Sequence, residues 1–452
     1  MQTRAIPKNM SVRTTFSPTP RTLRIRGFSA IREADLTLNS LTILTGPQAS
    51  GKSLVCKLTY FFQEFIDQSF SAVVDGQTIA AFEKSQAARF CEWFPQSAWG
   101  DKKFEVEYSV PDLSMSVTRA SRRSKYGSDA VFSFDSKFSE VYEELRDAYA
   151  STKKGRSGDD ELVFIRSQEN WRFRQQFLKV ISDRYAGSIA SSQTYVPASR
   201  AFFTTMGKAM TAFEHGQFLD PITKSFGRLY GNLVDRMRHG FPLAYDFGRA
   251  GSPGAKYRNN KMANIFGGKP KLIKGDMAIE APDGRVIPFN ALSSGQQELL
   301  PLWLTLDYYE TFLQYSEEVR GSRFLYIEEP EAHLFPEAQA GILDILSSLL
   351  RRREVRAQMV LTTHSPYILA KANNLLLAGK LGFRKRIDRQ SRIDKIVPKS
   401  RWLLESNVSC YGLQDGLAID LIGEDGLIST DYIDEVSQVV IDEFEKLLEA
   451  GA

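Results

Sequence analysis

A glycine-rich stretch near the start of the chain has the residue types and spacing that bind phosphate groups. Residues 46–53 read GPQASGKS and fit the pattern GxxxxGK[ST] with Gly46, Pro47, Gln48, Ala49, Ser50, Gly51, Lys52 and Ser53. Glycines let backbone N–H groups converge on phosphate oxygens, a lysine reaches the β- and γ-phosphates, and a hydroxyl ligates Mg²⁺. An apolar run precedes the stretch and apolar residues at helical spacing follow it. The pattern therefore predicts a nucleotide and Mg²⁺ site between a strand and a helix.

Two carboxylates and a histidine follow two other apolar runs. FLYIEEP, residues 324–330, reads as a buried strand ending in Glu328 and Glu329, and His364 comes just past the run in LTTHSP. At a strand end, Glu328 can hold Mg²⁺ through water while Glu329 activates the attacking water, as phosphoryl transfer requires. Two solvated glutamates and an exposed histidine are the plain alternative. Beside a phosphate loop, catalytic carboxylates and a γ-phosphate contact for His364 are favoured.

A second helix N-terminus also has the chemistry to attract an anion. In NALSSGQQELL the turn Ser293, Ser294, Gly295 opens a predicted helix from Gln296. Hydroxyl and amide groups at such a turn bind anions, although the same residues also serve as an ordinary helix cap. A chain with one phosphate loop needs a second anion site only if that site serves another subunit's nucleotide.

The elements around these residues predict an α/β fold. The last third of the chain alternates helices with the apolar runs RFLYIEEP and AQMVLTTH, which indicates a parallel sheet covered by helices on both faces. Ligands of such sheets bind at the carboxyl ends of the strands, where the polar residues lie. Further expected elements are three short strands in 22–45, hairpins in 103–118 and around 283–284, and helices in 139–185. Residues 249–274, rich in Gly, Lys, Arg and Asn, are expected to contribute least to the core.

Length and composition limit the domain organisation and the class of protein. At 452 residues the chain exceeds the usual size of one domain. We expect a flexible tail at 1–20, an N-terminal lobe at 21–205, a helical or irregular insertion forming a short arm at 206–275, and a C-terminal lobe at 276–452. A net charge of +4 gives no warrant for a nucleic-acid binder. Three separated cysteines and the lack of a long apolar run predict a cytoplasmic protein without a metal-binding cysteine cluster.

Taken together, the motifs resemble those of the ATP-binding-cassette (ABC) ATPases, in the SMC/RecF/OLD-like branch. GPQASGKS looks like Walker A, LSSGQ like the signature, FLYIEEP like Walker B, EAHLFP like the D-loop region and TTHS like the histidine switch. Glu328 stands where transport cassettes usually have Asp. The resemblance implies a P-loop fold with a mostly parallel sheet, an antiparallel β subdomain and a helical insertion.

That resemblance also implies an arrangement of subunits. Two ATP molecules would lie between head-to-tail copies, with Ser293 and Gly295 of one copy contacting the ATP held by the other. The candidate for the metal-contacting Q-loop glutamine is Gln193 in SSQTYVPASR, with Arg200 a second polar residue near the same strand end. A structural glutamine at the start of a strand is the alternative for Gln193.

Three kinds of cassette protein compete. A transporter cassette has its signature much nearer Walker A than Ser293 is to Lys52. A DNA-repair ATPase would use a groove or the basic segments RASRRSK, RRRE and KLGFRKRIDRQSRIDK, although such runs are usually solvated faces. A self-contained OLD nuclease needs a metal-dependent domain after the ATPase, whereas the acidic tail here has apolar residues at helical spacing, which predicts a packed terminal helix.

The combination of a short arm, YVPASR, an EEPE Walker B and the tail GLISTDYIDEVS looks like the ATPase of two-gene bacterial anti-phage defence systems. It is most similar to the phage anti-restriction-induced (PARIS-like) type, and Septu-type or retron-associated ATPases look alike. The resemblance implies an oligomeric ATPase that controls a nuclease partner encoded nearby.

Overall fold

The computed structural model describes residues 21–100, 103–120, 129–153, 162–185, 190–206, 219–239, 253–273, 276–315, 322–350, 357–383, 387–429 and 442. Three features expected from the sequence lie outside or largely outside these residues: the N-terminal tail, the basic loop in RASRRSK and the C-terminal helix. None of the described helices is long and apolar enough to cross a membrane.

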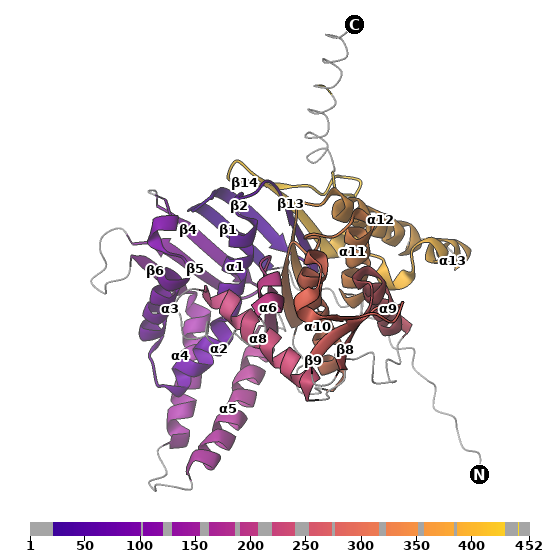
Figure 1. The fold of residues 1–452 in the computed structure, drawn as a ribbon. Coiled ribbons are helices and arrows are strands. Elements are labelled where there is room, and N and C mark those ends of the chain that lie inside the picture. The colour runs from indigo at the N-terminus through magenta and orange to yellow at the C-terminus, as the bar shows by residue number, and fades with distance from the viewer. Residues whose placement is uncertain are drawn as a thin grey trace, which may run out of the picture.

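One large sheet runs through the described part of the molecule (Figure 1). Its 11 strands lie in the order β6 (Ala130–Phe134), β5 (Leu113–Arg119), β4 (Glu105–Val110), β1 (Arg21–Phe28), β2 (Ile31–Leu38), β14 (Leu417–Asp420), β13 (Val408–Gln414), β3 (Leu41–Thr45), β12 (Ala357–Thr363), β11 (Ser322–Glu328) and β7 (Ala190–Val196). The strands from β13 to β7 pair in parallel, and those from β6 to β2 pair antiparallel. The α/β fold with a parallel core and an antiparallel β subdomain is confirmed.

The parallel strands are buried on both faces because alternate side chains enter two different cores. In β11, Phe324 and Tyr326 join a cluster rich in aromatic rings, while Leu325 and Ile327 join a second, mostly aliphatic cluster. Successive strand residues point to opposite faces, so a continuous apolar run suits a strand covered on both sides. This is why FLYI reads as an unbroken apolar run in the sequence.

Helices from different parts of the chain cover the two faces. The aromatic cluster includes residues of α1 (Lys52–Gln63), α2 (Phe65–Val74), α3 (Ile79–Trp93), α4 (Ser136–Lys153) and α5 (Leu162–Arg184). The aliphatic cluster includes residues of α6 (Ala201–Met206), α8 (Pro221–Arg238), α9 (Pro253–Phe266), α10 (Ser294–Tyr315), α11 (Pro336–Leu350) and α12 (Pro366–Phe383). The short helix α13 (Ile387–Ile396) packs against α12.

The middle of the chain departs from one expectation. Residues 249–274 were expected to contribute least to the core, yet α9 buries Met262 and Phe266 among the aliphatic cluster. These two side chains lie four residues apart and share one helix face. A separate three-stranded sheet follows, with β8 (Lys269–Ile273), β9 (Asp276–Glu280) and β10 (Val286–Pro288) in antiparallel pairing.

Among the described residues, the helices that project from the sheet lie outside the segment predicted to be an arm. Figure 1 shows α4 and α5 extending side by side away from the sheet, whereas α8 and α9, from 206–275, lie against the aliphatic core. The break between α4 and α5, predicted at KKGRSGDD, falls on residues outside the described part. The proposed division into lobes stays a prediction.

Candidate nucleotide site

The separate polar segments meet at one edge of the sheet. In the strand registers, Thr45 at the end of β3 pairs with Thr363 at the end of β12, and Glu328 at the end of β11 pairs with Thr362. Parallel strands present their carboxyl ends at the same edge, which is where ligands of such sheets bind. The phosphate loop, the two carboxylates and His364 therefore come together, as the sequence predicts.

The phosphate loop follows a path that only glycine allows at two points. Gly46 has φ +144°, and a Cβ on it would lie 2.3 Å from the Leu413 carbonyl oxygen of β13. Gly51 has φ +103°, and its Cβ would lie 2.8 Å from Ile31 Cγ1. Both positions thus combine a left-handed backbone with a close approach. Between them the side chains of Pro47, Gln48 and Ala49 are exposed.

Lys52 lies at the centre of this loop. Its buried ammonium donates to the carbonyls of Gly46, at 2.9 Å, and Pro47, at 2.7 Å. Burial lowers the pKa of Lys52, against the opposing effect of the three nearby glutamates. The buried hydroxyl of Ser50 has no hydrogen-bond partner. A lysine held by its own loop and an unsatisfied hydroxyl beside it fit a site that binds an anion.

Glu328 is oriented by two hydrogen bonds. Its Oε1 accepts from the hydroxyl of Tyr195 at 2.7 Å, and its Oε2 accepts from the backbone N–H of Ala198 at 3.1 Å. An ionised carboxylate has about four lone-pair sites, so acceptor capacity remains after these two bonds. Ser53 is exposed in the first turn of α1. The two oxygen donors fit a hard cation such as Mg²⁺ that draws its other ligands from phosphate and water.

Glu329 is held in an uncommon backbone conformation. Its φ is +41°, in the left-handed region, and its N–H donates to the Thr362 carbonyl at 3.0 Å. Its side chain is 40% exposed, and its Oε1 lies 3.5 Å from His364 Nε2. Non-glycine residues in this region cluster at functional sites, where the surroundings compensate for the strain. The geometry thus presents a carboxylate and an imidazole together on the open side of the edge.

Glu331 was not singled out from the sequence. Its Oε1 accepts from the Thr363 hydroxyl at 2.6 Å and from the backbone N–H of His364 at 2.7 Å. Its Oε2 is buried without a hydrogen-bond partner, and burial raises the pKa of this carboxyl. Glu331 therefore fixes the turn that carries His364. The third carboxylate of EEPE was the available signal.

The turn at the start of α10 satisfies its own polar groups. Ser293 Oγ and Gln296 Oε1 lie 3.2 Å apart, and Gln296 Oε1 also accepts from the Ser293 N–H at 3.1 Å, in the manner of a capping box. Gln296 Nε2 donates to the Phe266 carbonyl at 2.9 Å. A Cβ on Gly295 would lie 2.8 Å from the His333 carbonyl oxygen. Ser293 and its neighbour Ser294 are exposed, so the turn faces outward.

Gln193 lies apart from this group. It pairs with Phe324 in the register of β7 and β11, three residues before the carboxyl end of β7. Its Nε2 donates to the Tyr60 carbonyl at 3.0 Å, and its Oε1 accepts from the Tyr326 hydroxyl at 3.4 Å. These contacts fit the structural alternative for Gln193. Its role as a metal ligand stays a prediction.

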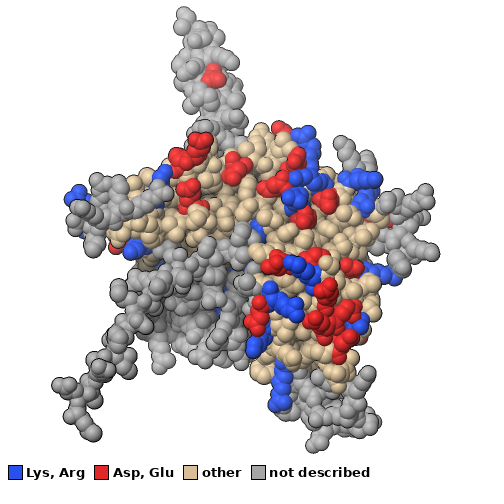
Figure 2. Space-filling view, turned by 180° about the vertical axis from the view of Figure 1, so that it is seen from behind, with Lys and Arg blue, Asp and Glu red and all other residues tan. Residues whose placement is uncertain are grey.

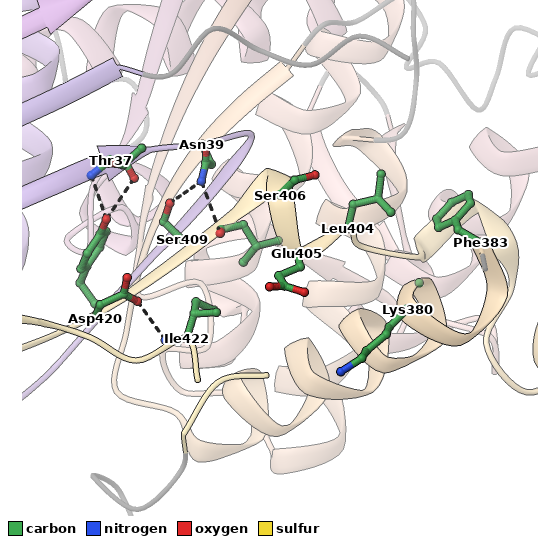
Figure 3. A pocket seen from close by; sticks show the side chains of 13 residues that line it. Thr37, Asn39, Lys380, Phe383, Leu404, Glu405, Ser406, Ser409, Asp420 and Ile422 are labelled. Carbon is green, nitrogen blue, oxygen red and sulfur yellow. Dashed lines mark hydrogen bonds between the residues drawn. The ribbon is translucent and has the colours of Figure 1, made fainter. Parts of the chain in front are cut away.

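A cavity of about 550 Å³ opens at the opposite end of the parallel strands. Figure 3 shows Asn39, before β3, donating to Ser409 of β13, with Lys380 and Glu405 also in the lining. Asn39 and Ser409 lie at the amino ends of β3 and β13, Glu405 lies just before β13, and Lys380 lies in the last turn of α12. Because the phosphate loop follows the carboxyl end of β3, this cavity is not the nucleotide site.

The model of the family described as "AAA domain, putative AbiEii toxin, Type IV TA system" matches residues 41–370. No curated protein matches the sequence.

Several solved structures match most of the chain at low identity and low TM-score. The SMC head domain from Thermotoga maritima is 13% identical, with a TM-score of 0.33, over 89% of this chain and 98% of that one. An Smc head domain with an extended coiled coil, bound to the C-terminal domain of ScpA and derived from Pyrococcus furiosus, is 11% identical, with a TM-score of 0.36, over 94% and 99%. The recombination mediator protein RecF with ATP is 10% identical, with a TM-score of 0.36, over 91% and 99%.

Proposed function

The chain belongs to the AAA-domain family whose description names a putative AbiEii toxin of a type IV toxin–antitoxin system, and we propose that it hydrolyses ATP at paired sites formed between two copies. One observation carries the proposal. Lys52, Glu328, Glu329 and His364 meet at one sheet edge within a single copy, whereas the Ser293 turn faces outward. A site that is complete on one side and open on the other suits a second copy as its missing half.

The residues of the edge divide the chemistry among themselves. Lys52 exchanges a loop carbonyl for the β- and γ-phosphate oxygens of ATP. Glu329 accepts a proton from the attacking water at its carboxylate, and His364 Nε2, 3.5 Å from that carboxylate, contacts the γ-phosphate. Ser53 and Glu328 would hold Mg²⁺, which when bound neutralises phosphate charge.

Exposed aromatic side chains on this edge support contact with a second copy. Phe335 is 78% exposed and immediately follows Leu334, whose Cδ2 lies 3.5 Å from the position of a Cβ on Gly295. Tyr367, 48% exposed, lies in the first turn of α12, just past His364. Aromatic residues are enriched at protein interfaces, so these exposed rings offer contact area, Phe335 next to the outward-facing turn and Tyr367 next to His364.

The test of paired sites is the dependence of ATP turnover on protein concentration. If two copies form each site, turnover per chain should rise with concentration and level off as the pairs saturate. Sedimentation over the same range, with and without ATP, should show association that follows the activity. Turnover per chain that stays constant while the protein remains monomeric would contradict the proposal.

We further propose that the ATPase controls a partner nuclease in bacterial anti-phage defence. The support is the resemblance of the motif set to two-gene defence ATPases, together with a family description that names a toxin–antitoxin system. Co-expression with the product of the adjacent gene, followed by mass measurement of the purified assembly, tests this. A co-purifying nuclease whose activity changes with ATP supports the proposal. An adjacent repair operon and a lack of any stable partner would contradict it.

Action on DNA in repair or recombination is the alternative function. On the face shown in Figure 2, blue and red side chains are interspersed over the described residues, without a continuous basic strip. The basic segments noted in the sequence lie partly outside the described residues. DNA stimulation of turnover that weakens steeply with salt would favour this alternative.

A further inference from the structure

A fully buried arginine lies behind the catalytic carboxylates. Arg200 Nε donates to the Glu298 carbonyl at 2.9 Å, and Nη1 donates to the carbonyls of Glu328, at 2.7 Å, and Pro197, at 3.3 Å. Nη2 donates to the Glu329 carbonyl at 2.9 Å. One guanidinium thus binds four backbone carbonyls. A lysine has three donors on one atom and cannot span these positions, whereas arginine has five donors in a rigid plane.

These four carbonyls belong to three different elements. Pro197 follows β7, Glu328 ends β11 and Glu329 follows it. Glu298 lies in α10, shortly after the Ser293 turn. The side chain of Glu298 reinforces the link, because its Oε2 lies 3.4 Å from Arg200 Nε. Burial lowers the pKa of Arg200, and the Glu298 carboxylate is the largest opposing influence.

A second tie joins the same region to α10. Thr204 of α6 donates from its hydroxyl to the Gln297 carbonyl at 2.9 Å, and α6 packs along α10 (Figure 1). The segment that starts with Arg200 and continues into α6 is therefore attached to the first turn of α10 at two points.

Glu329 is fixed from both sides of its backbone. Its N–H is bound by Thr362 and its carbonyl by Arg200, and its φ of +41° needs such support. The position of the Glu329 carboxylate consequently depends on where Arg200 lies. Arg200 in turn depends on α10 through the carbonyl and carboxylate of Glu298.

We propose that Arg200 is a positioning residue that couples the start of helix α10 to the backbone of Glu329. Contact of the Ser293 turn with the nucleotide of a second copy shifts or steadies α10, and Arg200 passes this on to the carboxylate that activates water. Each copy then hydrolyses its own ATP efficiently only while its turn is engaged. The inference rests on the proposed function, because it requires ATP hydrolysis at paired sites.

The coupling is tested with Arg200→Lys, which keeps the charge and removes the planar fork. A catalytic group misplaced by about 1 Å can cost up to 100-fold in rate, so we expect kcat to fall about 10- to 100-fold. ATP affinity, measured at equilibrium, should stay within about twofold, because Arg200 does not contact the phosphate loop. Arg21→Lys is the matched control. Arg21 is equally buried at the other end of the sheet, where it contacts Gln358 and Phe324, and its replacement should leave kcat unchanged.

A double-mutant cycle with Glu298→Gln adds a second readout. This variant keeps the shape of the side chain and weakens its hold on Arg200, so kcat should fall less than in Arg200→Lys. The combined variant should lose little more than Arg200→Lys alone, since residues of one network are not additive. If Arg200→Lys does not fold, Glu298→Gln alone tests the coupling: its kcat should fall while its ATP affinity stays unchanged.

Three results would overturn the coupling. They are an unchanged kcat in Arg200→Lys, an equal loss of kcat in Arg21→Lys, and a loss of ATP affinity that matches the loss of turnover. Glu329→Gln, measured in parallel, separates the two proposals. If wild type turns over ATP and Glu329→Gln does not, a normal Arg200→Lys removes the coupling and leaves the proposed function intact. Absence of turnover in wild type removes the proposed function itself.

Discussion

The two helix N-termini that are proposed to bind phosphate in this chain are built in opposite ways. The phosphate loop is locked in place: Gly46 and Gly51 have left-handed backbones against neighbouring strands, and Lys52 is buried with carboxylates close enough to affect its pKa. The turn at Ser293 is relaxed, exposed and satisfied by its own capping partner, Gln296.

This difference indicates a division of roles. A loop with a buried lysine and two positions that require glycine can hold and polarise a ligand on its own, since its charge acts where water is partly excluded. An exposed cap has little to offer until another surface covers it. In the proposed function, the first site therefore binds ATP and does the chemistry, while the second completes the site of a neighbour. Each prediction below separates these two halves.

Glu329→Gln should have the largest effect, and only on the phosphate-loop half. Removal of a general base typically costs 10²- to 10⁴-fold in rate, so we expect turnover to fall by about that factor. ATP affinity should persist, because the amide keeps the size of the side chain and the loop is untouched. Turnover and equilibrium ATP binding measure the two effects. Normal turnover in this variant would remove Glu329 as the base.

Lys52→Ala should weaken ATP binding itself. Hydrogen bonds to charged groups contribute about 1.5–3 kcal/mol, which corresponds to a loss of about 10- to 150-fold in ATP affinity. Lys57→Ala is the control on the same helix. Lys57 forms an ion pair with Asp220 at 3.7 Å. The Lys57→Ala variant should bind ATP with wild-type affinity. Wild-type affinity in Lys52→Ala would show that residues 46–53 are not the nucleotide loop.

The sequence predicts the phosphate-loop half better than it predicts the strand β13, which packs against the loop. The strands β3, β11 and β12 are mostly apolar at their centres because both faces are buried, so their ends and the polar residues there follow from the sequence pattern. The strand β13, VSCYGLQ, mixes Ser409 and Gly412 into its run and was not expected. Yet Leu413 of β13 forms the wall that makes Gly46 obligatory.

The tertiary contacts of polar side chains could not be predicted from the sequence. Glu331 and Arg200 act through hydrogen bonds to the backbone of other elements, and no local pattern encodes a partner that lies 33 residues away, as for Glu331, or 128 residues away, as for Arg200. Gln193 shows the reverse case. Its place near a strand suggested a ligand, but the register puts it well before the strand's carboxyl end.

Ser293→Arg should affect only the half that serves a neighbour. Because Ser293 is exposed, the larger side chain should leave the fold and ATP binding intact while it obstructs the second copy's nucleotide, which lowers turnover. Ser293→Ala is the control for loss of the cap, which costs about 1 kcal/mol of stability. Mixing Ser293→Arg with Lys52→Ala sharpens the test, since each pure variant lacks one half of every site.

In a mixed pair, the intact loop of the Ser293→Arg chain faces the intact turn of the Lys52→Ala chain. One complete site forms, so ATP-dependent association should recover in the mixture, whereas turnover should stay low because the only chain that binds ATP has its own turn blocked. If both variants are folded but the mixture does not associate in the presence of ATP, the Ser293 turn does not act on a neighbour's nucleotide.

Glu331→Gln should have the smallest effect, on stability and its pH dependence. Burial raises the pKa of Glu331 above its ordinary value of 4.5, so the folded state binds a proton more tightly than the unfolded state. In the window between these two pKa values the folded protein holds more protons, and the free energy of unfolding falls as pH rises. Each unit of pKa elevation corresponds to about 1.4 kcal/mol.

The glutamine in Glu331→Gln keeps an acceptor for the Thr363 hydroxyl and the His364 N–H but cannot ionise. The contribution of residue 331 to the pH dependence of the free energy of unfolding should therefore vanish. Denaturant unfolding at several pH values above 4.5 measures the difference, with the exposed Glu424→Gln as control. A slope that is unchanged in Glu331→Gln would mean that this carboxylate stays charged in the folded state at no cost. The buried Oε2, which has no hydrogen-bond partner, argues that the cost is real, because an unpaired charge there has no partner to offset its desolvation.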